Sequence, residues 1–258
     1  MQERHKNRSL YFNEQAYTTD KYVTPFIERK KTVTPDCHVL EIGCGEGGNL
    51  KPFLDKGCHC TGIDLNSEQI QRAKDFFADH PHVDQLRLID SDIYDIDPME
   101  HQYDVIMLRD VIEHIHDQER FMRILPQFLK PHGVVFFAFP PWMMPFGGHQ
   151  QICKSKLSKV PYFHLLPMAW YKALLQACGE TSVDALVEIK ETGITIERFE
   201  RILREEGYNT LEKELYFINP NYEIKFHLRP RKALPLFRSI PYLRDFYITA
   251  GYYLVSKS

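Results

Sequence analysis

The chain has 258 residues, of which 43% are hydrophobic and 26% charged, and its formal net charge at pH 7 is −3. This composition is typical of folded globular proteins and excludes wholesale disorder, and the lack of a strong positive charge argues against a nucleic-acid partner. The apolar run 134–146 is interrupted by Pro140, Pro141 and Pro145, so it cannot form a transmembrane helix, which needs about 20 apolar residues. The charged start 1–6 lacks the apolar core of a secretory signal, and we therefore expect a cytoplasmic protein. Six cysteines without a Cys-x-x-Cys pair predict reduced, mostly buried thiols.

Short apolar runs and helical patterns alternate between residues 38 and 140. The apolar runs predict strands over 38–43, 58–65, 85–90, 103–108 and 133–139. The intervening patterns predict a helix over 47–56, a helix capped by Asn66, and a helix capped by Asp117 that is kinked at Pro126. Strands that alternate with helices in this way predict a doubly wound α/β fold with a mostly parallel sheet.

The alternation stops after Pro140. Residues 141–192 contain helical patterns and no clear strand, which we interpret as a helical insertion after the fifth strand. A helix is predicted over 195–206, and two late strands over 210–218 and 246–255. We therefore expect one domain with a seven-stranded, Rossmann-like sheet whose last strand is antiparallel. Its expected parts are an N-terminal helical segment 1–37, a cofactor-binding half 38–140, an inserted helical lid 141–192, and a C-terminal helix with a strand hairpin, 193–258.

A glycine-rich loop lies between the first strand and the first helix. Residues 43–48 have the spacing Gly-x-Gly-x-x-Gly, which lets the backbone approach a nucleotide-like cofactor closely. Asp64 ends the next strand 21 positions after Gly43, where a carboxylate can meet ribose hydroxyls. These features suit NAD and S-adenosylmethionine equally. Glu41 and Asp92 favour the second cofactor, because Glu41 would repel a pyrophosphate but attract an ammonium group, and Asp92 offers an acceptor for an adenine amino group.

Across residues 38 to 140 the chain resembles class I S-adenosylmethionine-dependent methyltransferases. Val39-Leu-Glu-Ile-Gly-Cys-Gly-Glu-Gly47 is similar to their first motif, Gly62-Ile-Asp-Leu65 to the second, and Asp90-Ser-Asp-Ile93 to the third. The segments 103–114 and 129–133 are similar to the motifs of the fourth strand and of the approach to the fifth strand. The order and the spacing of these motifs carry the resemblance.

The resemblance implies binding of S-adenosyl-L-methionine and transfer of its methyl group to a small-molecule acceptor, which we expect to be a hydroxyl oxygen. Glu41 is expected to meet the methionine ammonium group, and Asp64 to take both ribose hydroxyls. The expected cofactor-binding residues are Glu41, Gly43, Cys44, Gly45, Asp64, Leu65, Asp92, Ile93 and Arg109. Two alternatives stay open, an NAD(P)-dependent oxidoreductase and a non-catalytic regulator that binds S-adenosylmethionine.

The expected catalytic residues follow the fourth and fifth strands. Asp110, Glu113 and His114 are spaced i, i+3 and i+4, so a helical turn would present them on one face. His149 follows the fifth strand, and neighbouring parallel strands end at the same edge of a sheet. We therefore expect Asp110, His114 and His149 to lie within reach of one cavity, where a histidine with a pKa of about 6.5 can take a proton from a hydroxyl group.

The run 110–114 also resembles the metal-binding segment of ubiquinone-pathway O-methyltransferases and of small-RNA 2′-O-methyltransferases. In the latter a second histidine completes the site, and His149 is the candidate for that position here. Carboxylate and imidazole groups can hold a divalent cation. A Glu-His pair after the fourth strand is also common in methyltransferases that need no metal. Metal binding is therefore left open, and a histidine base is the preferred interpretation.

Two further segments have alternative interpretations. The insertion 141–192 is rich in aromatic residues, which predicts a lid that closes through Gly147 and Gly148 over an apolar acceptor pocket; helical packing or a dimer contact is the alternative. The segment from Lys225 to Arg244 contains six basic residues and no acidic one. It could contact an anionic substrate, RNA or a membrane surface, but a solvated connection between the last two strands is the preferred interpretation. The sequence predicts no oligomeric state.

Overall fold

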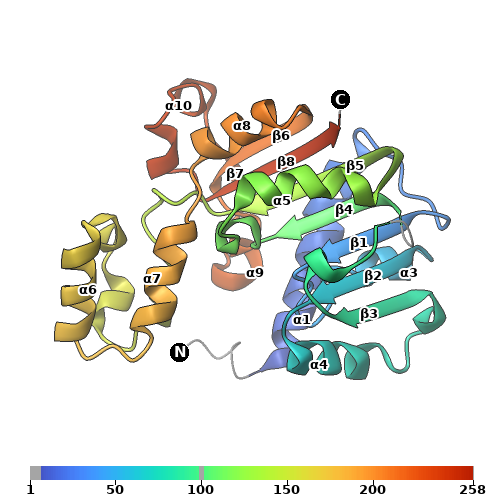
Figure 1. Ribbon diagram of the computed structural model, residues 1–258, viewed down its shortest axis with the longest axis horizontal. Coiled ribbons are helices and arrows are strands. Elements are labelled where there is room, and N and C mark those ends of the chain that lie inside the picture. The colour runs from blue at the N-terminus through green and yellow to red at the C-terminus, as the bar shows by residue number, and fades with distance from the viewer. Residues whose placement is uncertain (1–6, 99–101, 258) are drawn as a thin grey trace.

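The computed structural model describes residues 7–98 and 102–257, so the charged start at 1–6 lies outside the described residues. Its centre is an eight-stranded sheet with helices on both faces (Figure 1). The strands are β1 (His38–Ile42), β2 (His59–Asp64), β3 (Leu86–Asp90), β4 (Tyr103–Arg109), β5 (Leu129–Phe139), β6 (Tyr208–Ile218), β7 (Arg231–Lys232) and β8 (Ala250–Lys257). The α-helices are α1 (Arg8–Thr18), α2 (Thr24–Glu28), α3 (Lys51–Asp55), α4 (Ser67–Phe77), α5 (Gln118–Ile124), α6 (Met168–Ala177), α7 (Val183–Thr192), α8 (Ile196–Glu205), α9 (Tyr222–Phe226) and α10 (Pro235–Arg238).

The strand order is β3-β2-β1-β4-β5-β8-β6-β7. Strands β1 to β5 are parallel, whereas β8 lies antiparallel between β5 and β6. The predicted doubly wound, mostly parallel sheet with an antiparallel last strand is therefore confirmed. The predicted number of seven strands is wrong by one, because β7 contains only two residues and follows Pro230. A strand of two residues is too short to show the alternation of apolar and polar residues by which a sequence predicts a strand.

Both faces of the sheet are buried. In β5 the odd-numbered residues Val135, Phe137 and Phe139 pack with α5 and α8, and the even-numbered residues 134, 136 and 138 pack with helices α1 to α4. Successive side chains of a strand point to opposite faces, so an uninterrupted apolar run is what a doubly covered strand requires. The two helical layers leave the carboxyl ends of β1 to β5 at one edge, and this edge carries the site.

Several predicted boundaries differ from the structure for local reasons. The helix predicted over 47–56 begins only at Lys51, because Gly47 has a φ of +79° and the chain turns over residues 47–50. Helix α5 ends at Ile124, and a 3₁₀ turn replaces the predicted kinked helix around Pro126, which cannot donate a helical hydrogen bond. The strand predicted over 246–255 begins at Ala250, because Arg244–Phe246 forms a 3₁₀ turn.

The inserted segment 141–192 forms α6, α7 and three 3₁₀ turns, and contains no strand, as predicted. Figure 1 shows α6 and α7 set apart from the sheet. The insertion has a small apolar core of its own, which includes Phe163, Tyr171 and Leu186. A Cβ atom added at Gly148 would lie 2.4 Å from that of His164, so Gly148 permits close packing of the loop. Within the described ranges 7–98 and 102–257, no helix combines the length and the apolar character that crossing a bilayer requires.

Candidate functional site

The glycine loop turns sharply at the end of β1. The amide groups of Gly43 and Cys44 both donate to the carbonyl oxygen of Ile63, at 2.8 and 3.0 Å, which ties the loop to β2. Gly43 has a φ of +68°, and a Cβ atom there would lie 2.6 Å from Val111 Cγ2. Gly45 has a φ of +55°. Only glycine adopts these conformations without strain, so the loop backbone stays open to a ligand.

Asp64 is the last residue of β2 and faces the glycine loop. Its carboxylate accepts a hydrogen bond from the Gly45 amide at 2.7 Å and another from the Asn66 amide at 2.9 Å. An ionised carboxylate offers about four acceptor positions, so two protein donors leave capacity for further donors such as hydroxyl groups. Asp64 therefore shapes the loop and remains able to bind a ligand.

A cavity of about 390 Å³ extends from this loop along the carboxyl edge of the sheet. Five of the residues predicted to bind the cofactor line it, together with one predicted catalytic residue: Gly43, Asp64, Leu65, Asp92, Ile93 and His114. The Asp92 carboxylate caps the 3₁₀ turn Ile93–Asp95 by accepting from the Tyr94 amide at 3.1 Å. The volume lies within the range of about 300–1,000 Å³ that small-molecule sites occupy.

Glu41 and Arg109 lie behind the cavity in a buried polar network and do not line it. The Glu41 carboxylate accepts from Asn49 Nδ2 at 2.6 Å through Oε1, whereas its buried Oε2 atom has no hydrogen-bond partner among the described residues. Burial raises the pKa of Glu41 to about 8. Arg109 donates to Thr19 Oγ1 at 2.9 Å and to the side-chain oxygens of Asn49 and Asn221.

An unpartnered buried carboxylate oxygen fits the cationic ammonium group of S-adenosylmethionine, and it would repel an anionic pyrophosphate. The glycine loop, Asp64 and Asp92 add the open backbone and the acceptors that a nucleoside needs. The residues present therefore fit this cofactor. Cys44 is buried beneath the loop, and desolvation raises the pKa of its thiol well above the usual value, so the thiol stays protonated.

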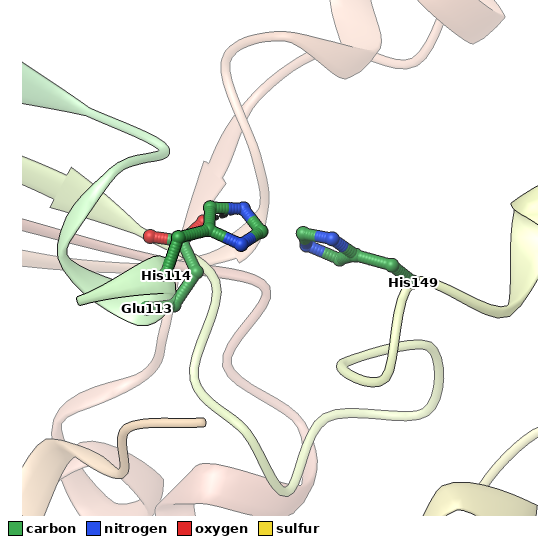
Figure 2. Close-up of side chains that lie close together, drawn as sticks. All are labelled: Glu113, His114 and His149. Atoms are coloured by element: carbon green, nitrogen blue, oxygen red, sulfur yellow. Dashed lines mark ion pairs between the residues drawn. The ribbon is translucent and has the colours of Figure 1, made fainter. Parts of the chain in front are cut away.

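The structure brings His114 and His149 together from segments that are far apart in the sequence. His114 lies in the 3₁₀ turn Ile112–His114 after β4, and His149 lies in the loop after β5. Their ring centroids are 5.1 Å apart, and Figure 2 shows the two rings facing each other across a gap. Asp110 and His149 both adopt left-handed backbone conformations, with φ values of 56° and 51°. Such conformations of non-glycine residues are often found at functional sites.

The electrostatics of this cluster keep both histidines neutral near pH 7. Burial, together with the neighbouring His114 and Lys225, lowers the pKa of His149 to about 4. Burial also lowers the pKa of His114, although the charge of Asp110 opposes this shift. Asp110 keeps contact with solvent, but desolvation by the groups around it raises its pKa against the attraction of Arg109. A neutral imidazole can accept a proton or coordinate a metal ion.

Glu113 completes a group of potential metal ligands. One ligand atom from each of Glu113, His114 and His149 lies within 4.8 Å of the others, and Figure 2 shows the three side chains converging. Both carboxylate oxygens of Glu113 are buried without a hydrogen-bond partner among the described residues, and burial raises its pKa well above the usual value. One carboxylate and two imidazoles match the donors that divalent transition metals and Zn²⁺ accept.

Some residues of the site had no signal in the sequence. Tyr94 and Arg120 line the same cavity, and the Arg120 guanidinium lies 4.4 Å from the centroid of the Tyr94 ring. Lys225 and Tyr222 of α9 interact electrostatically with Asp110. The sequence shows Lys225 only as the first member of the basic run 225–244. Only the tertiary fold brings α9 to the site.

Comparisons with known proteins agree with this geometry. A family described as "Methyltransferase domain" matches residues 12–156, which is more than half of the chain. The ubiquinone biosynthesis O-methyltransferase of Rhodopseudomonas palustris (strain BisB5) is 35% identical over 100 residues, 39% of this chain and 38% of that protein. Phosphoethanolamine N-methyltransferase 2 of Caenorhabditis elegans is 26% identical over 216 residues, 81% of this chain and 44% of that protein. The matches thus span less than half the length of these two relatives.

Among solved structures, an S-adenosylmethionine-dependent methyltransferase from Clostridium acetobutylicum ATCC 824 is similar, with a TM-score of 0.58 and 13% identity. The similarity covers 99% of this chain and 96% of that one, and at this identity it shows the fold. The chain belongs to the class I S-adenosylmethionine-dependent methyltransferases. It is an enzyme with S-adenosyl-L-methionine as its cofactor, so the oxidoreductase and regulator alternatives fall away.

Proposed function

We propose that the chain methylates a hydroxyl oxygen of a small molecule. The observation that carries this proposal is a pair of neutral histidines: His114 lines the cofactor cavity, and the His149 ring lies 5.1 Å from the His114 ring. Methyl transfer from a sulfonium needs alignment of the acceptor with the methyl carbon, and a hydroxyl acceptor must also lose its proton. A neutral imidazole at this position can accept that proton.

The cofactor-binding residues have separate roles in this proposal. Gly43, Cys44 and Gly45 form the loop that approaches the cofactor, and Asp64 accepts from both ribose hydroxyls. Asp92 accepts from the adenine amino group, while Leu65 and Ile93 provide apolar contact with the base. Glu41, behind the cavity, attracts the methionine ammonium directly or through water, and Arg109 holds Asn49, which donates to Glu41. Bound S-adenosylmethionine supplies the activated methyl group.

A screen that measures S-adenosylhomocysteine release tests the proposal. Its panel contains small phenols and quinol precursors, with matched amines in which an amino group replaces the hydroxyl. We expect turnover with hydroxyl acceptors and at most weak turnover with the amines. Faster turnover with an amine would assign N-methylation, the reaction for which the Caenorhabditis elegans relative is named.

A second form of the site would hold a divalent cation between Glu113, His114 and His149. The buried carboxylate of Glu113 without a partner favours this form, because an isolated buried charge is costly unless a cation compensates it. A bound cation would lower the pKa of the acceptor hydroxyl, and the protein ligands would fix its position.

In this second form EDTA should abolish turnover, and Mg²⁺ or Mn²⁺ should restore it, because removal of the cation takes away the group that lowers the pKa of the acceptor hydroxyl. Glu113→Gln should be insensitive to both treatments and should have low activity. The control is the affinity for S-adenosylhomocysteine, measured by calorimetry with and without EDTA, which should not change. Full turnover in EDTA would assign the proton transfer to a histidine acting without a metal.

The raised pKa of Glu41 predicts that cofactor binding depends on pH. With a pKa of about 8, Glu41 is mostly protonated at lower pH, and it must lose its proton to attract the ammonium group. The affinity for S-adenosylhomocysteine should therefore rise between about pH 6 and pH 8, by at most about tenfold per pH unit. Calorimetry in buffers of different ionisation enthalpy should detect release of the proton.

Two variants provide the controls for this pH dependence. Glu41→Gln should lower the affinity and remove its pH dependence. Glu46→Gln should keep the pH dependence, because Glu46 is paired with Arg72 at 2.7 Å. A wild-type affinity that is constant over this pH range would contradict the proposed role of Glu41.

We further propose that residues 1–258 form one methyltransferase domain, whose parts are 1–37, 38–140, 141–192 and 193–258. In this proposal the insertion 141–192 closes over the acceptor. Its separate apolar core supports movement as a unit. The Trp142 amide donates to the Ile194 carbonyl oxygen at 2.8 Å, which joins the two chain segments that connect the insertion to the sheet. The cytoplasmic location and the small-molecule partner stay predictions.

A further inference from the structure

A basic and apolar segment between β7 and β8 projects from the edge of the sheet opposite β3. All ten residues from 234 to 243 are exposed. Six of them are large and hydrophobic, with exposed fractions between 38% and 74%: Leu234, Leu236, Phe237, Ile240, Tyr242 and Leu243. A contiguous exposed apolar patch of this kind is rare on a free protein surface and indicates an interaction site.

Ion pairs and hydrogen bonds anchor this segment to the rest of the fold. The buried Arg244 guanidinium pairs with Glu197 and Glu200, each at 2.8 Å, and the amide of Tyr242 donates to the same Glu197 carboxylate at 2.8 Å. The hydroxyl of Tyr247 donates to the Phe237 carbonyl at 2.6 Å. The backbone is therefore anchored while the apolar side chains point outward.

Basic side chains accompany the apolar patch. The segment from Lys225 to Arg244 contains six basic residues and no acidic one, in a chain whose net charge is −3. Lys232 pairs with Glu214, but Arg229, Arg231 and Arg238 are exposed and have no ion-pair partner among the residues that the structure describes. Apolar groups beside unpaired cations match a surface that combines hydrocarbon with negative charge.

The insertion also carries exposed apolar side chains, and it contacts the chain next to the patch. The hydroxyl of Tyr162, in the insertion, donates to the carbonyl oxygen of Phe246 at 3.0 Å. Phe146, Ile152, Val160 and Tyr162 of the insertion are also exposed. The insertion therefore contacts the chain directly after the patch.

We propose that residues 229–243 form a docking surface for an anionic lipid bilayer. A second copy of the chain fits less well, because a symmetric contact would place the unpaired arginines against one another. RNA also fits less well, since stacking on bases requires aromatic rings and four of the six exposed hydrophobic residues are aliphatic. The proposal does not depend on which atom is methylated.

Sedimentation with phospholipid vesicles tests this surface. We expect the full chain to bind vesicles of equimolar phosphatidylcholine and phosphatidylglycerol, to bind pure phosphatidylcholine weakly, and to dissociate as salt is added. Leu234→Ser/Leu236→Ser and Arg231→Gln/Arg238→Gln should each weaken binding to the anionic vesicles by about tenfold or more. These side chains are exposed, so the thermal midpoint and the affinity for S-adenosylhomocysteine should not change.

The control is Val83→Ser/Lys74→Gln, which replaces one apolar and one cationic side chain at exposed positions near β3, on the far edge of the sheet. This variant should bind vesicles as the wild type does. Absence of wild-type binding to anionic vesicles, or equal binding by all variants, would overturn the proposal. A dimer that Leu234→Ser/Leu236→Ser dissociates, or binding of an RNA oligonucleotide without binding of vesicles, would overturn it in favour of those partners.

Discussion

His149→Asn and His114→Ala are each expected to lower the rate of methyl transfer by about 100- to 10,000-fold, the usual contribution of a positioned acid–base group. The two rings are 5.1 Å apart, and burial keeps both of them neutral, which is the form able to take a proton or hold a cation. Asparagine is chosen at position 149 because it tolerates the left-handed backbone found there. The expected loss is the same for a metal-free base and for a metal ligand.

The affinity for the cofactor separates a catalytic defect from a folding defect. His149 does not line the cavity that contains the glycine loop, so calorimetry with S-adenosylhomocysteine should give nearly wild-type affinity for His149→Asn. His82→Ala, a histidine near β3, should retain full activity. The double variant should lose no more than the more severe single one, because groups that act together are not additive. Full activity of both single variants on a genuine acceptor would refute the assignment.

Asp64→Asn is expected to weaken binding of S-adenosylhomocysteine by about tenfold or more. A hydrogen bond to a charged acceptor is worth about 1.5–3 kcal/mol, and the ribose offers two hydroxyl donors. The asparagine keeps the size of the side chain and one oxygen that can accept from the Gly45 or Asn66 amide, so the loop should persist. Calorimetry measures the affinity, and thermal unfolding of the ligand-free protein reports the stability of the loop.

The control for this prediction is Asp90→Asn. Asp90 lies beside Asp64 in the parallel register of β2 and β3, but it is exposed and does not line the cavity. Its replacement should leave the affinity unchanged. Unchanged affinity in Asp64→Asn would show that the Asp64 carboxylate serves only the glycine loop.

The sequence by itself determined the sheet and the order of its cofactor-binding motifs. Strands β1 to β5 could be predicted because each is a local apolar run, and the strand–helix alternation predicts that they are parallel. The positions of Gly43, Asp64 and Asp92 could be predicted because each lies at the carboxyl end of a strand. A local signal is enough where the geometry of one element places the residue.

The tertiary structure alone decided which of these residues share the cavity. Arg109 follows the same topological rule as Asp110, but packing of the π-helix Thr19–Val23 against it buries its guanidinium behind the cavity. The closeness of His149 to Glu113 and His114 depends on the path of the insertion, which carries His149. The exposure of residues 234–243 could not be predicted, because an apolar sequence ordinarily predicts burial. Contacts between distant segments result from packing over the whole fold, which no local pattern records.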